Sequence, residues 1–77
     1  MFMKSKIKKI FKEFNKLNKD SNIVIELGKI EHAYVIYFTR GFLSLPFYIT
    51  PISLKVIDKD TVKLVYNKMK NNLEYGV

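Results

Sequence analysis

The sequence has no cysteine and only one histidine, His32, and these two shortages limit the nucleophiles and general bases that are available for catalysis. Without cysteine the chain forms no disulfide and has neither a thiolate nucleophile nor a thiolate metal ligand. Its three glycines, at positions 28, 41 and 76, are too far apart to form a phosphate-binding loop. The sequence therefore predicts a protein without a metal, a cofactor or a catalytic site.

The remaining candidates for chemistry are weak. His32 stands beside Glu31 within a predicted strand, where adjacent side chains point to opposite faces. A general base needs a partner held close on the same side. Asp58 and Asp60 resemble a metal-binding pair, but they stand where a helix is predicted to begin, and capping accounts for them.

Long hydrophobic runs are also absent. The longest unbroken apolar run, residues 33–38, has six residues, far fewer than the roughly 20 of a membrane span. The first residues carry lysines, but no apolar stretch typical of a secretory signal follows them. We therefore expect one cytoplasmic domain over residues 1–77.

Arginine is the other scarce residue: Arg40 stands against thirteen lysines, and the formal net charge is +7. Residues 1–19 hold seven lysines and one acid, a net charge of +6, so nearly all of the excess lies on one segment. Residues 2–19 also repeat apolar side chains at helical spacing, which predicts a helix with an apolar stripe on a core. The predicted stripe consists of Met3, Ile7, Ile10, Phe11, Phe14 and Leu17.

The middle of the chain is typical of strands. Apolar alternation predicts strands over residues 23–27, 30–40 and 45–50, with a turn at Gly28–Lys29 and another beginning at Gly41. Proline provides no N–H to a ladder, so Pro46 indicates an edge strand.

Residues 51–57 fit two structures. Ile52, Leu54 and Val56 alternate as in a fourth strand, which is the interpretation we favour, whereas Thr50–Pro51 is typical of a helix start. A C-terminal helix is then predicted, capped by Asp58 or Asp60 and ended by Gly76.

This order predicts an α+β fold: a small two-layer sandwich with an N-terminal helix, an antiparallel meander of three to four strands, and a C-terminal helix. Both helices are expected on one face of the sheet, because each has an apolar stripe to bury. Two helices cover one face only. The face with Val24, Ala33, Val35 and Tyr37 is expected to stay open, because the opposite arrangement would expose Tyr34, Ile36 and Phe38.

The open face is the first candidate binding surface. Its predicted partner-binding residues are Val35, Tyr37 and Tyr48, together with Arg40 and Phe42, which are expected to project from a loop at the strand end. Tyrosines on a sheet either anchor a protein interface, including a homodimer, or stack unpaired bases. Alternatively, a loop or residues 51–57 fold back over them, and Phe42 closes the end of the core.

The lysine-rich helix is the second candidate. Lys8, Lys9, Lys12 and Lys16 are the predicted nucleic-acid-binding residues, placed to neutralise phosphates of DNA or RNA. The alternative is a solvated face that keeps the protein soluble. Membrane binding is disfavoured, since the domain needs the apolar stripe for its own core.

In size, lysine and asparagine content and lack of a catalytic set, the chain resembles small accessory proteins of phages that infect low-GC bacteria. This resemblance is one of composition and assigns no residue a role. It leads to the expectation of a non-enzymatic binding protein that inhibits or modulates a host replication, transcription or defence component in the host cytoplasm.

Overall fold

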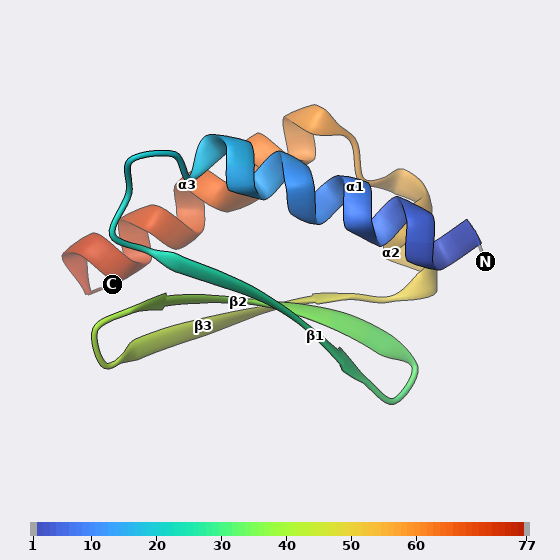
Figure 1. The fold of residues 1–77 in the computed structure, drawn as a ribbon, viewed down its shortest axis with the longest axis horizontal. Coiled ribbons are helices and arrows are strands. Elements are labelled where there is room, and N and C mark those ends of the chain that lie inside the picture. Colours follow the sequence, from blue (N-terminus) through green and yellow to red (C-terminus); the bar gives the residue numbers. More distant parts are fainter. Residues whose placement is uncertain (1, 77) are drawn as a thin grey trace.

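The computed structural model describes residues 2–76, and side chains from residue 5 onward within that range. Figure 1 shows two layers, with the helices packed on one face of a three-stranded antiparallel sheet. The element order is α1 (Phe2–Leu17), β1 (Val24–Ile30), β2 (Ala33–Arg40), β3 (Leu43–Ile49), α2 (Pro51–Val56) and α3 (Lys59–Tyr75). The predicted α+β sandwich is confirmed, with three strands rather than four.

Helix α1 lies on the sheet through its apolar stripe. Ile7, Ile10 and Phe14 are buried, while Phe11 and Leu17 pack beside them at the edge of the core. The side chain of Met3, predicted on the same stripe, lies outside the described residues. Because these residues recur every three or four positions, one side of the helix faces the sheet and the lysines are left to solvent.

Strand β2 is the centre of the sheet, and β1 and β3 are its edges. Ile25 pairs with Phe38 and Ile36 pairs with Phe47, so one parity of each strand meets the helices. Pro46 lies in edge strand β3 as predicted, where its missing N–H disrupts no central ladder.

Both hairpins have two-residue turns. The first is Glu31–His32, because Ile30 pairs with Ala33, and His32 has a positive φ of 65°. The predicted turn at Gly28–Lys29 is therefore wrong: β1 continues through both residues. The second turn is Gly41–Phe42, and Gly41 has a φ of 60°, which glycine adopts without a steric penalty.

Residues 51–56 form helix α2, so the favoured prediction of a fourth strand is wrong. Thr50 accepts a hydrogen bond from the Ser53 amide, the Ser53 side chain accepts one from the Thr50 amide, and Pro51 takes the first helical turn. This reciprocal capping box satisfies free amides at the helix start. Only Leu54 of α2 is buried, whereas Ile52 and Val56 face solvent.

Helix α3 begins and ends as predicted. Asp58 is its N-cap and Gly76, with a φ of 67°, is its C-cap. Val62, Tyr66 and Leu73 are buried against α1 and the sheet. The ring of Phe14 makes edge-on contacts with Phe38 at 5.3 Å and with Phe47 at 6.1 Å between centroids, so one aromatic cluster joins the two layers.

Candidate functional site

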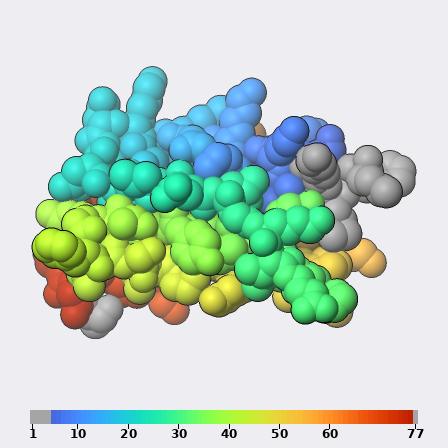
Figure 2. All heavy atoms as spheres, turned by 60° about the horizontal axis from the view of Figure 1, so that its bottom comes forward, coloured from blue at the N-terminus to red at the C-terminus, as the bar shows by residue number. Residues whose placement is uncertain are grey.

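The face of the sheet turned away from the helices, called the outer face here, is not covered by the described chain. Tyr37 is 38% exposed, Tyr48 54% and Val24 56%, although all three are large apolar or aromatic residues within strands. Figure 2, in which the sheet comes forward, shows side chains of all three strands open on this side. The outer face consists of Val24, Glu26, Gly28, Ile30, Ala33, Val35, Tyr37, Thr39, Ser44, Pro46 and Tyr48.

Val35 lies at the centre of the outer face and is almost completely buried, with 1% of its surface exposed. It is paired with Gly28 on one side and Tyr48 on the other. A Cβ atom added to Gly28 would lie 3.3 Å from Val35 Cγ1 and 3.5 Å from Tyr37 Cε2. The Tyr37 ring therefore leans over the glycine, and the strands form a small, filled apolar surface rather than a hollow.

The outer face has no basic residue, although the chain carries a net charge of +7. Both basic residues within the sheet, Lys29 and Arg40, have the parity of Tyr34 and Phe38, which face the helices. Lys29 Nζ lies 5.8 Å from the centroid of the Tyr34 ring. The single charge on the outer face is the carboxylate of Glu26.

The prediction that Arg40 projects from a loop is wrong. Arg40 is the last residue of β2, is half-buried, and its Nη1 atom donates a hydrogen bond of 3.3 Å to the carbonyl of Leu73 near the end of α3. It thus lies on the opposite side of the sheet from Tyr37 and Tyr48. Phe42 stands at the tip of the β2–β3 turn and is fully exposed, so it does not close the core.

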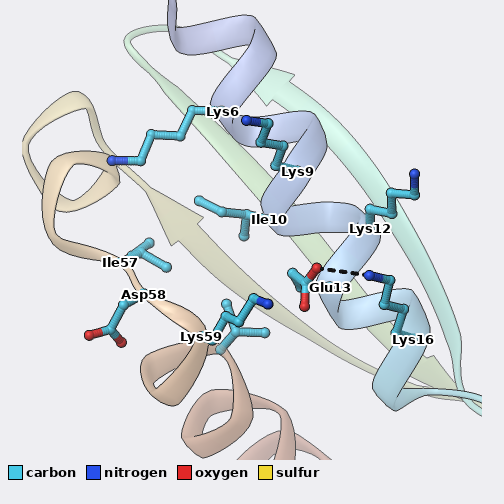
Figure 3. A pocket seen from close by; sticks show the side chains of 10 residues that line it. Lys6, Lys9, Ile10, Lys12, Glu13, Lys16, Ile57, Asp58 and Lys59 are labelled. Carbon is cyan, nitrogen blue, oxygen red and sulfur yellow. Dashed lines mark hydrogen bonds and ion pairs between the residues drawn. The ribbon is translucent and has the colours of Figure 1, made fainter.

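The predicted lysines of α1 all lie on its exposed side. Lys9, Lys12 and Lys16 border a groove of about 410 Å³ between α1 and the start of α3, whereas Lys8 is exposed but does not line this groove. Figure 3 shows Ile10 of α1 facing Ile57 across the groove, with the lysines of α1 on one wall and Lys59 on the other. The complete lining is Lys6, Lys9, Ile10, Lys12, Glu13, Lys16, Ile57, Asp58, Lys59 and Val62.

No comparison gives the chain a family: neither models of known protein families, nor curated proteins, nor solved structures match it. Among residues 2–76, no helix is long and apolar enough to cross a bilayer.

The ionisable groups predicted to be structural occupy ordinary surface positions. The prediction that Glu31 and His32 point to opposite faces of a strand is wrong: both lie in the β1–β2 turn, where His32 Nε2 is 3.4 Å from Glu31 Oε1 and both side chains are 87% exposed. Asp58 Oδ1 accepts hydrogen bonds of 2.8 Å from both the amide and the hydroxyl of Thr61. These bonds to the charged form lower the pKa of Asp58, as expected of a helix cap.

Several residues of these surfaces were not predicted, among them Ile30, Pro46 and Lys59. Ile30 and Pro46 belong to the outer face, and strand parity from Tyr37 and Tyr48 would have identified both once the register was known. Lys59 borders the groove from α3, far along the chain from the lysines of α1. No local pattern connects it with them, because the pairing is made only by the packing of α1 against α3.

Proposed function

We propose that the protein is a non-enzymatic binding protein that occupies the surface of another protein with its outer face. The supporting observation is that Tyr37 and Tyr48 remain exposed on a sheet that its own helices cover only on the other side. Tyrosine is enriched at protein interfaces and is often among the residues that contribute most binding energy. Val35 serves as the rigid support beneath them.

The charge of the outer face favours a protein over nucleic acid as its partner. Sheet-based single-strand binders combine stacking aromatics with basic side chains that hold the phosphates. Here the tyrosines are present, but the only charged side chain of the outer face is the carboxylate of Glu26, which is paired with Tyr37. The basic residues of the sheet, Lys29 and Arg40, face the helices instead. A phosphate backbone laid across this face would meet no cation.

Net charge favours an acidic partner over a second copy. Two copies each carry +7, so their approach is opposed by long-range repulsion. A protein with an apolar patch within an acidic surface is attracted instead, and such complementarity raises the association rate. We therefore assign the outer face to an acidic protein and treat homodimerisation as the competing outcome.

The size of the face sets the expected affinity. Strands of seven or eight residues, rising about 3.3 Å per residue and spaced about 4.8 Å apart, present a surface of roughly 25 Å by 15 Å. This is smaller than the roughly 800 Å² per partner of a standard interface. We expect a transient complex in the micromolar range, extended by contact with Phe42 at the turn.

The resemblance in composition to small phage accessory proteins adds an expectation about the partner. We propose that the partner is a host replication, transcription or defence component in the host cytoplasm. Its activity would be inhibited or modulated because this protein covers part of its surface. Arg40 takes no part in this proposal, because its guanidinium is held against the end of α3.

The test uses two outer-face variants and one matched control. Tyr37→Glu and Tyr48→Glu each place a charge on the outer face, whereas Leu64→Glu places one at an apolar position of α3 that is 73% exposed. Circular dichroism first confirms that each variant is folded. Each tagged protein is then used to capture partners from a bacterial lysate, and any captured protein is purified and titrated by calorimetry.

The proposal requires an acidic protein that binds the wild type and Leu64→Glu and loses at least tenfold in affinity with either tyrosine variant. Equal affinity for all variants overturns it. Sedimentation velocity at 10 to 200 µM protein supplies the other decisive outcome: a dimer that Tyr48→Glu dissociates would show that a second copy covers the face.

A further inference from the structure

We propose that the groove between α1 and α3 is a second binding site, which holds the phosphate backbone of double-stranded nucleic acid without reading its sequence. This site lies in the helix layer, away from the outer face, and it does not depend on the function proposed above. Its occupant is indicated by charge: four lysines line the wall formed by α1, and Lys59 lines the wall at the start of α3.

The basic side chains of the groove are available to a ligand. Within the described part of the chain, the one ion pair at the groove joins Lys16 Nζ to Glu13 Oε2 at 3.2 Å. The other carboxylate, that of Asp58, is engaged with Thr61 at the helix cap. Lys6, Lys9, Lys12 and Lys59 thus lie within 4.0 Å of no carboxylate among the described residues.

The basic track continues beyond the main groove. Two adjoining hollows share Lys16 with it, and they add Lys19 in the turn after α1 and, on α3, Lys63 together with Asp60. From Lys6 to Lys16 the helical rise of 1.5 Å per residue gives a track of about 15 Å. One strand of a duplex presents a phosphate about every 3.4 Å along its axis, so the track along α1 spans about four phosphates.

The lining distinguishes a duplex from a single strand. No aromatic residue lines any of these hollows, so unpaired bases would find no surface on which to stack. Base-specific contacts most often come from arginine, and the one arginine is bound to the Leu73 carbonyl. Lysines alone hold phosphates as point charges, which predicts binding that is independent of sequence.

An anionic membrane is a poorer occupant. An amphipathic helix binds a bilayer by burying its apolar side chains among the lipids. In α1 these side chains, Ile7, Ile10 and Phe14, are 1%, 6% and 0% exposed because they form the protein core. Only the charges of this helix are available, and charge without apolar insertion suits a duplex better.

The experiment measures fluorescence anisotropy of a labelled 20-base-pair duplex with the full chain at 50 and 200 mM NaCl. With four phosphates neutralised, each releasing about 0.9 counterions, the affinity should fall about 100-fold between these concentrations. Two variants of equal net charge are compared: Lys9→Gln/Lys12→Gln in the groove, and Lys55→Gln/Lys68→Gln, exposed and outside it. Glutamine has nearly the helix propensity of lysine, so all proteins should fold alike.

The groove variant should bind at least tenfold more weakly at 50 mM NaCl, and the slope of log affinity against log salt concentration should become smaller by about two. In the control variant, the change in log affinity and the change in slope should each be less than about a third of those of the groove variant. Tyr48→Glu should bind the duplex like the wild type, which separates this site from the outer face. The proposal is overturned by equal effects of the two lysine pairs, by no binding at 50 mM NaCl, by tighter binding of the unpaired 20-mer, or by preference for phosphatidylserine vesicles.

Discussion

The hydroxyl of Tyr66 donates a hydrogen bond of 2.8 Å to the side-chain oxygen of Asn18, although the two residues are 48 positions apart. The side-chain Nδ2 of Asn18 in turn donates a hydrogen bond of 2.7 Å to the carbonyl of Ile23. One asparagine therefore connects α3, the end of α1 and the loop that enters β1. The ring of Tyr66 is 4% exposed, so this polar contact lies at the border of the core.

Replacing Tyr66 with phenylalanine should lower the free energy of unfolding by about 1–2 kcal/mol, because the ring still fills its space while the Asn18 oxygen loses its donor. Urea denaturation followed by circular dichroism measures the change. Tyr75→Phe is the control, since Tyr75 is 74% exposed near the end of α3. An unchanged midpoint for Tyr66→Phe would show that water replaces the lost bond.

Phe14→Ala should destabilise the protein by about 3–5 kcal/mol, because the buried ring contacts two other aromatic rings and its removal leaves a cavity. A domain of this size has a total stability of about 4–12 kcal/mol, so this single substitution should remove a large fraction of it. Thermal unfolding by circular dichroism measures it. Phe42→Ala, at the exposed turn, should change the stability by less than about 0.5 kcal/mol.

Thr50→Val tests why residues 51–56 form helix α2 instead of the predicted strand. It keeps the shape of the side chain but removes the hydroxyl that accepts the Ser53 amide at 3.2 Å, so the start of α2 loses its cap. The expected loss is about 1 kcal/mol in a urea titration. If Thr50→Val caused no loss of stability, the cap would not be what makes residues 51–56 a helix rather than a strand.

The spacing of apolar residues predicted the fold correctly wherever the apolar side chains are in fact buried. The apolar spacing of residues 7–17 determined which side of α1 is buried, and the strand alternation correctly separated Ile36 and Phe38 from Tyr37. The same alternation misled at α2, where Ile52 and Val56 are solvent-exposed. There a capping box of two hydroxyl side chains, which is independent of hydrophobicity, decides the structure.

The errors at the candidate sites came from positions whose meaning depends on neighbouring strands. Gly28 was predicted to turn the chain, yet it provides room beside Val35 for the ring of Tyr37. Arg40 was predicted to project from a loop at the strand end, whereas strand parity places it with Phe38 on the side of the helices. Such cross-strand relationships are set by register, which no single segment of sequence encodes.

Asp58 gives the protein a defined dependence on pH. Hydrogen bonds from Thr61 lower the pKa of Asp58 below its ordinary value of 3.8 in the folded state. A carboxyl whose pKa is lower when folded binds protons more readily when unfolded, so its stabilising contribution is present above about pH 4 and is lost as the pH falls through the folded pKa.

Asp58→Asn isolates this contribution, because asparagine caps a helix about as well but does not titrate. Above pH 4 the wild type should be the more stable protein, since a negative charge at the start of α3 is favourable. Between pH 5 and pH 2 its urea midpoint should fall more steeply than that of Asp58→Asn, and the difference between the two should disappear at the acidic end. The other carboxyl groups are common to both proteins and cancel in the comparison. Parallel curves over the whole range would mean that the charge of Asp58 adds nothing to the cap beyond its hydrogen bonds.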